Sequence, residues 1–382
     1  MKPVYLDYNA TTPVDPEAVE ELLPYLAGQF GNPSSAHPYG VKAKEAVELA
    51  RSRVAALLGC DPSEVIFTGG GTESNNQALI GAALANRERG NHIISTAIEH
   101  PAVLKPLERL SARGFSVTLL PVDSTGMVDP DSVRRAITGH TILISIMHAN
   151  NEVGTIQPIG EIGELARENG IIFHTDAAQS VGKIPSRTDE LRVDLLTVAG
   201  HKLYAPKGVG ALFVRRGVKV DACLFGAAQE KGLRPGTENV PYIAALGKAA
   251  ELAALRLASD GARILALRDR LHQRLDALSG GVVLNGHPAR RLPNTLNISF
   301  RGVAGAQLLE RVPRIAASTG SACHEGSGEL SGVLKAMGIS RQQGFGAVRL
   351  SIGRTTTEED IDRAAEAIAQ GVKELRESHP RR

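Results

Sequence analysis

Short apolar runs alternate with amphipathic stretches between about residue 60 and residue 215 of the chain. The apolar runs have the length and composition of buried strands, and the stretches between them repeat their apolar positions at helical spacing. The expected strands are 64–67, 92–95, 116–120, 141–147, 171–174, 194–198 and 210–214. Strands that alternate with helices form a mainly parallel sheet covered by helices on both faces. The sequence therefore predicts an α/β fold with seven such strands.

Several local signals mark where the helices of this region begin and end. Asp129 precedes Pro130 as an N-cap precedes a proline at the first helical position, and His100-Pro101 opens an amphipathic segment in the same way. Gly114 stands where the second of these helices should end. An earlier helix is expected over about 42–58.

The pattern changes after Pro241, where a long helical stretch runs to about residue 278. Strand-like runs follow at 295–300 and 348–352, and a last helix begins near Thr357 with Asp360 three residues on, close to a capping box. These elements predict a smaller α+β domain joined through the long helix. We expect residues 15–257 to form the large domain, and residues 1–14 and 258–382 to form the small one.

Composition narrows the class of protein. A chain of 382 residues is long for one hydrophobic core, and 42% hydrophobic with 22% charged residues is ordinary for a globular protein. A net charge of +2 gives no long-range field for nucleic acid or an acidic membrane surface. The chain shows no signal-peptide pattern and no apolar run long enough to cross a bilayer. We therefore expect a cytoplasmic protein with neither a nucleic-acid nor a membrane partner.

Two of the expected strands end in residues that can carry chemistry. Asp176 follows strand 171–174, and Lys202 follows strand 194–198 in Ala199-Gly200-His201-Lys202. Ligands of open α/β sheets bind at the carboxyl ends of the strands. A lysine and an aspartate are the pair that pyridoxal phosphate needs, because the amine forms a Schiff base with the aldehyde and the carboxylate keeps the pyridinium protonated. Two solvated side chains are the alternative interpretation, and the other motifs argue against it.

A glycine-rich turn follows strand 64–67 and precedes a helical run. In Thr68-Gly69-Gly70-Gly71-Thr72, backbone N–H groups near Gly71 and the hydroxyl of Thr72 can bind a phosphate. The pattern is neither a P-loop nor a dinucleotide fingerprint. His201, next to Lys202, is a candidate for a second phosphate donor.

Three further polar residues fit a cofactor and a substrate carboxylate. His100 ends a strand region and can stack on a flat ring or move protons near neutral pH. Arg349 lies on the polar side of strand 348–352, where a guanidinium suits a carboxylate, and Asn151 can touch both cofactor and substrate. For His100 and Arg349 the alternative is an ordinary surface side chain.

The three cysteines differ in their surroundings. Cys323 is flanked by Ser, Gly, His and Glu, which predicts an exposed, mobile loop from about 320 to 331 and a thiol that can act as a nucleophile. Cys60 is typical of a turn, and Cys223 lies beside apolar residues. The cysteines and histidines show no paired ligand spacing, so no metal site is expected.

Taken together, these motifs resemble the cysteine desulfurases, the class V branch of the fold-type I pyridoxal phosphate (PLP) enzymes. The resemblance covers nearly the whole chain. The stretches that carry it are 5–13, 30–35, 71–76, 99–100, 150–154, 176–182, 200–202, 321–323 and 348–351.

The resemblance implies a role for each candidate residue. Lys202 would be the Schiff-base lysine, Asp176 would pair with the pyridinium nitrogen, and Gln179 would bond the ring oxygen O3′. His100 would stack on the ring and act as acid and base. Gly71, Thr72 and His201 would also bind the cofactor, together with Thr237 from the other subunit of a homodimer. Asn151 and Arg349 would bind the substrate carboxylate. Cys323 would be the persulfide carrier.

The implied reaction converts L-cysteine to L-alanine and leaves a persulfide on the enzyme. The sulfur would pass to an acceptor or scaffold protein in iron–sulfur assembly, tRNA thiolation or another sulfur modification. A selenocysteine lyase is the nearest alternative. A class V aminotransferase would have no use for Cys323, and a non-catalytic sulfur-transfer scaffold would not need Lys202 and Asp176. The chain departs from the common family pattern at Ala199, where many members have serine, and in the glycine-poor segment 224–230.

Overall fold

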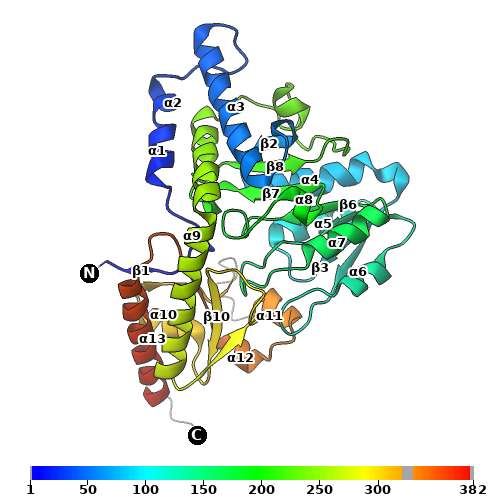
Figure 1. Cartoon of the computed structure of the whole chain (residues 1–382). Coiled ribbons are helices and arrows are strands. Elements are labelled where there is room, and N and C mark those ends of the chain that lie inside the picture. The colour runs from blue at the N-terminus through cyan, green and yellow to red at the C-terminus, as the bar shows by residue number, and fades with distance from the viewer. Residues whose placement is uncertain (1, 321–329, 379–382) are drawn as a thin grey trace.

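Two sheets and one long helix organise the computed structural model, which describes residues 2–320 and 330–378 (Figure 1). The larger sheet has seven strands and confirms the mainly parallel arrangement. In spatial order they are β2 (Val65–Thr68), β8 (Gly210–Val214), β7 (Leu195–Ala199), β6 (Ile172–Asp176), β5 (Thr141–Ser145), β3 (His92–Thr96) and β4 (Ser116–Leu120). Only β8 runs antiparallel to its neighbours, β2 and β7.

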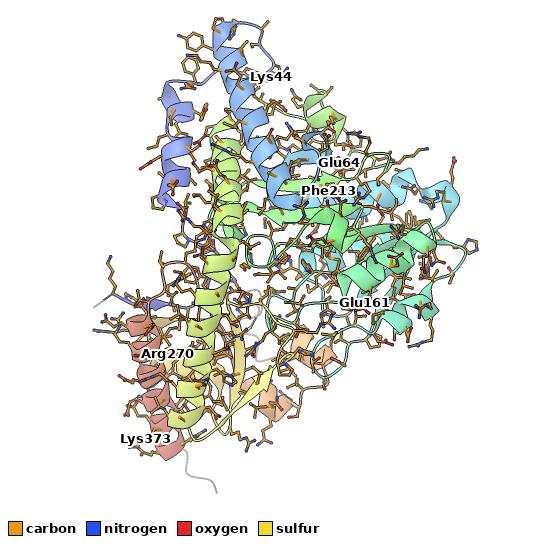
Figure 2. All side chains as sticks on the ribbon, in the orientation of Figure 1. Lys44, Glu64, Glu161, Phe213, Arg270 and Lys373 are labelled. Atoms are coloured by element: carbon orange, nitrogen blue, oxygen red, sulfur yellow. The ribbon has the colours of Figure 1, made fainter. Side chains whose placement is uncertain are left out.

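Both faces of this sheet are covered by helices, as the continuous apolar runs predict. Adjacent residues of β2 face opposite sides of the sheet. Ile66 packs with α4 (Gly71–Ala85) and α5 (Pro101–Ser111), and Phe67 packs with the helices of the opposite layer. That opposite layer contains α3 (Pro38–Leu58), α6 (Pro130–Ala136), α7 (Ile159–Glu168) and part of α9 (Val240–Leu278). Figure 2 shows Phe213 of β8 within this packed interior.

The smaller sheet has three antiparallel strands in the order β12 (Ala347–Ser351), β10 (Thr295–Phe300) and β9 (Val282–Asn285). It packs with α10 (Gly305–Arg311), α13 (Glu358–Ser378) and the second half of α9, so the smaller α+β unit is confirmed. The short strand β1 (Val4–Tyr5) pairs with β11 (Ile315–Ala316). The other short helices are α1 (Pro16–Leu22), α2 (Pro24–Ala27), α8 (Thr188–Leu191), α11 (Gly332–Ala336) and α12 (Arg341–Phe345).

Helix α9 belongs to both hydrophobic cores. Its residues from Val240 to Ala253 pack in the core of the large sheet, and those from Ile264 to Leu275 pack in the core of the small sheet. Beside α13 (Figure 2), Arg270 of α9 binds Asp362 with a nitrogen–oxygen distance of 2.7 Å. This change of partners supports the domain boundary near residue 257, which we retain as a proposal.

The helix caps follow the sequence signals closely. His100 and Asp129 are the N-caps of α5 and α6. Thr357 and Asp360 exchange reciprocal side-chain to backbone hydrogen bonds of 3.1 Å, which confirms the capping box at the start of α13. Helix α3 begins earlier than predicted, because His37 caps it ahead of Pro38. Within residues 2–320 and 330–378, no helix combines the length and the apolar character that crossing a membrane requires.

Candidate active site

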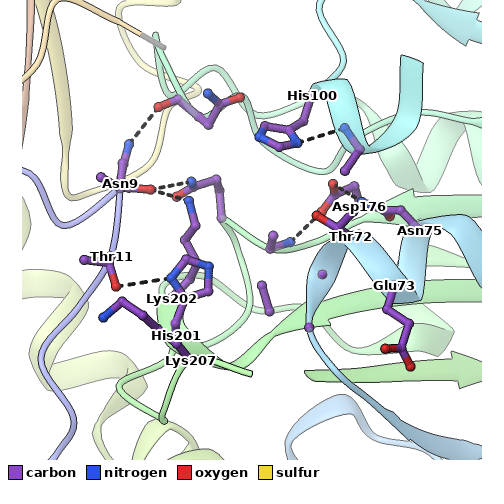
Figure 3. A pocket seen from close by; sticks show the side chains of 18 of the residues that line it. Asn9, Thr11, Thr72, Glu73, Asn75, His100, Asp176, His201, Lys202 and Lys207 are labelled. Carbon is purple, nitrogen blue, oxygen red and sulfur yellow. Dashed lines mark hydrogen bonds between the residues drawn. The ribbon is translucent and has the colours of Figure 1, made fainter. Parts of the chain in front are cut away.

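A cavity of about 520 Å³ lies at the carboxyl ends of β2, β3, β5, β6 and β7 (Figure 3). This is the edge where an open α/β sheet binds ligands. Residues 9–11 of the N-terminal segment and Arg349 of the small sheet complete the lining. The cavity therefore brings together the predicted residues Gly71, Thr72, His100, Asn151, Asp176, Gln179, His201, Lys202 and Arg349.

Asp176 is the last residue of β6, and its buried carboxylate is fixed from two sides. Its Oδ2 accepts a 2.7 Å hydrogen bond from Nδ2 of Asn75, and its Oδ1 accepts a 2.9 Å bond from the backbone N–H of Ala178. Asn75 lies on the buried side of α4 and was not predicted to have this role. Two donors to the charged form hold the carboxylate in one orientation toward the cavity.

Lys202 ends the 3₁₀ turn Gly200–Lys202 that follows β7. Gly200 is required at this turn, because a Cβ there would come within 2.6 Å of the Val209 carbonyl oxygen. The Lys202 amine donates to the backbone carbonyl of Asn9. Nε2 of Gln179 donates to the same carbonyl at 3.0 Å, so the N-terminal segment connects two of the predicted cofactor-binding residues.

His100 presents one defined edge to the cavity. As the N-cap of α5, it accepts a 3.1 Å hydrogen bond from the Ala102 N–H at Nδ1, so the neutral imidazole carries its proton on Nε2. Burial lowers the pKa of His100; the charge of Asp176 opposes this effect, and the charge of Lys202 adds to it. The neutral form is therefore favoured at pH 7, and its Nε2–H is the group that can donate a hydrogen bond.

A buried carboxyl group lies behind His100. Oε1 of Glu99 accepts hydrogen bonds from the Thr96 hydroxyl at 2.6 Å and from the Met147 N–H at 3.0 Å. Burial raises the pKa of Glu99 to about 8 despite these donors. Glu99 thus ties the segment after β3 to the segment after β5 in a largely neutral form.

The glycine-rich turn shapes one end of the cavity. Gly70 has a φ of 141°, and no described side chain caps the first turn of α4, where backbone N–H groups have no helical partner. Thr72 lies at this turn, and His201 and Lys207 line the other side of the cavity (Figure 3). Burial and neighbouring lysines lower the pKa of His201 to about 4, so Lys207 supplies the charge there.

The opposite end of the cavity contains Arg349 of β12, which is only 3% exposed. One guanidinium nitrogen binds Oδ1 of Asp7 at 2.7 Å, and another donates to the Asn151 carbonyl at 3.1 Å. Its buried Nε has no hydrogen-bond partner among the described residues. Arg349 is therefore not the exposed surface arginine of the alternative interpretation, and it keeps a donor available.

Two predicted residues are not part of this lining. Thr237 lines a neighbouring cavity of about 260 Å³ that shares Gly69, Gly208 and Val209 with the first. Cys323, with the mobility expected around it, lies outside the described residues. At the edge of that segment, the Ser331 hydroxyl donates to the buried carboxylate of Glu152.

The residues present fit PLP. A primary amine and a fixed carboxylate come from adjacent strand ends, and a turn rich in N–H donors lies with Lys207 at one end of the same cavity. Each matches one part of the cofactor: the aldehyde, the ring nitrogen and the phosphate. In the part of the chain that is described, no three His, Cys, Asp or Glu side chains are grouped to bind a metal ion.

Known proteins share this sequence and fold. Residues 4–364 match the family model described as Aminotransferase class-V. A protein of Methanosarcina thermophila named Cysteine desulfurase IscS is 51% identical over 99% of this chain and 94% of its own. A Nostoc protein named Cysteine desulfurase is 49% identical over 100% of this chain and 95% of its own.

Solved structures agree with these relatives. A "NifS-like protein" superposes with a TM-score of 0.91 at 38% identity, covering 97% of this chain and 99% of that one. A structure described as "SspA in complex with cysteine" has a TM-score of 0.81 at 36% identity, covering 91% and 98%. These likenesses confirm the fold-type I architecture. The chain belongs to the class-V aminotransferase family and, within it, to the PLP-dependent cysteine desulfurases.

Proposed function

We propose that this cavity binds PLP and removes sulfur from L-cysteine, with L-alanine and an enzyme persulfide as products. The observation that carries the proposal is the convergence of Lys202, Asp176 and Arg349 on one cavity, from the turn after β7, from β6 and from β12. When bound, PLP supplies an electron sink for negative charge that develops at the substrate Cα. Asp176 and Gln179 would bind the ring, while Thr72, His201 and Lys207 would bind the phosphate.

Other residues of the chain bind the substrate and transfer protons. Arg349 and Asn151 bind the substrate carboxylate, and Asp7 keeps the guanidinium in place. Lys202 Nζ, proposed as the Schiff-base lysine, would accept the proton from the substrate Cα. His100 would stack on the ring and act there as acid and base.

Cys323 is the proposed nucleophile. Its thiolate attacks the sulfur of the bound cysteine, a sulfur–sulfur bond forms and the Cβ–S bond breaks. The electron pair of that bond stays with the carbon skeleton, which takes up a proton and leaves as L-alanine. The sulfur remains on Cys323 as a persulfide, for transfer to an acceptor or scaffold protein.

The test is Cys323→Ala. This variant should bind PLP and change its absorption spectrum on adding L-cysteine, yet form no alanine above background. Cys223→Ala, which removes another free and half-buried cysteine, should keep full turnover and serves as the control. Alanine production by Cys323→Ala at the normal rate would contradict the proposal and favour the lyase alternative.

We also propose that the protein acts as a cytoplasmic homodimer. Phe30 and Tyr39 are 69% and 55% exposed with ring centroids 5.5 Å apart, and Phe225 is 91% exposed. Exposed aromatic side chains of this size are typical of contact surfaces. A second copy would also explain why Thr237 lies outside the cavity of its own chain. Sedimentation of a monomer at micromolar concentration would contradict the dimer.

A further inference from the structure

A chain of hydrogen bonds leads from the cavity to a lysine that the proposed reaction does not use. Lys183 Nζ donates to Oε1 of Gln179 at 2.9 Å. Nε2 of the same amide donates to the Asn9 carbonyl at 3.0 Å, and Lys202 donates to that carbonyl as well. Gln179 lines the cavity, whereas Lys183 lies behind it.

These contacts determine which way the Gln179 amide faces. The Asn9 carbonyl can only accept a hydrogen bond, so the group of the amide that faces it must be Nε2. Rotating the amide by 180° would place oxygen against oxygen at Asn9 and would turn Oε1, the acceptor of the Lys183 amine, away from it. In the observed orientation Nε2 keeps a second hydrogen, so the amide can act as a donor toward the cavity.

The surroundings of Lys183 disfavour a positive charge on its amine. No described carboxylate forms an ion pair with it, and the neighbouring charges are Lys202 and Arg349. Burial lowers the pKa of Lys183 well below its ordinary value, and those two cations lower it further. A buried amine near like charges is more often kept for a site than for stability.

We propose that Lys183 is a positioning residue that fixes Gln179 as a hydrogen-bond donor to the ring oxygen of the cofactor. The proposal rests on the proposed function, because that oxygen belongs to PLP. Its effect is indirect, since Lys183 acts through the amide and does not touch the cavity. By donating to Oε1, Lys183 also polarises the amide and strengthens its Nε2–H donor.

The test is a double-mutant cycle on cofactor binding. Apoenzyme of the wild type, Lys183→Met, Gln179→Leu and the double variant is titrated with PLP, and the dissociation constant and the visible spectrum are recorded. Lys183→Met should weaken binding about tenfold, which corresponds to about 1.4 kcal/mol, and alter the spectrum. In the Gln179→Leu background the same substitution should change neither quantity. Lys248→Met, at a half-buried lysine paired with Glu251 on α9, should behave like the wild type.

Two results would overturn the proposal. One is wild-type affinity and spectrum in Lys183→Met, and the other is an equal effect of that substitution with and without Gln179. If Lys183→Met does not fold, Lys183→Gln replaces it, since its shorter amide removes the charge and should still weaken binding. Alanine formation by the wild type is measured in parallel, so failure of the desulfurase reaction is distinguished from failure of the coupling.

Discussion

Two regions of the cavity are built differently: the ring end, which we define by Asp176 and Gln179, and the arginine end around Arg349. At the ring end, Asp176 and Gln179 already have hydrogen-bond partners inside the protein, from Asn75, Ala178, Asn9 and Lys183. At the arginine end, defined by Arg349, Asp7 and Asn151, the guanidinium is held on one side while its Nε keeps no partner among the described residues. The first arrangement suits a resident cofactor, and the second suits a ligand that arrives and leaves.

The strongest test of the ring end is Lys202→Ala. We expect turnover to fall by at least about 10³-fold, because both the covalent link and the base at Cα are lost. Borohydride reduction followed by peptide mass mapping should find no modified lysine. Lys207→Ala, which removes a cation from the same cavity, should keep the reducible link. A reducible link to another lysine in Lys202→Ala would show that the assignment is wrong.

The arginine end predicts a separable effect. Arg349→Ala should weaken L-cysteine binding by about 2–5 kcal/mol, because a desolvated charge-assisted contact is removed. The absorption spectrum and the affinity for PLP should stay unchanged, since the ring end has its own partners. Steady-state KM for L-cysteine, measured beside PLP titration, separates the two effects. Equal losses in both would mean that the two ends are not independent.

The ionisation of Glu99, beside the ring end, can be tested by the pH dependence of protein stability. Its pKa is raised to about 8 in the folded protein, so the stabilisation it gives is complete at low pH and is lost as the pH rises through that value. Glu99→Gln keeps the shape without the ionisation. The free energy of unfolding is measured with denaturant at pH 5 and at pH 8. From pH 5 to pH 8 it should fall by roughly 3 kcal/mol more in the wild type than in the variant. A parallel response of both proteins would mean that Glu99 is already ionised at pH 5.

The sequence predicted the elements that have strong local signals. Strand 210–214, which is buried over most of its length and reads as an apolar run, matches β8, and 116–120 and 295–300 match β4 and β10. β9 was missed because its residues are only half-buried over most of its length. The antiparallel direction of β8 was not specified, although residues 200–209 are too short for a helical crossover from β7.

In the site, too, residues with a local sequence signal were predicted, and residues that depend on distant contacts were not. Lys202, Asp176 and His100 were predicted because each follows a recognisable strand. Asn75 and Asn9 were not assigned their roles, because their partners lie 101 and 193 residues away in the sequence. No local pattern reports such a contact. The helical spacing of Asn75 with the apolar residues Leu79 and Ala82 was the one available hint.

The path of the N-terminal segment has a consequence for synthesis. Val4 pairs with Ile315, the Asn9 N–H donates to the Ser351 hydroxyl, and Asp7 binds Arg349. A ribosome releases the first member of each pair early and the second near the end of translation. The large sheet can form on the nascent chain, but these three contacts form only when the C-terminal strands exist. A chain terminated before β12 would thus contain Lys202 and Asp176 but lack Arg349, and its cavity would be missing the arginine end.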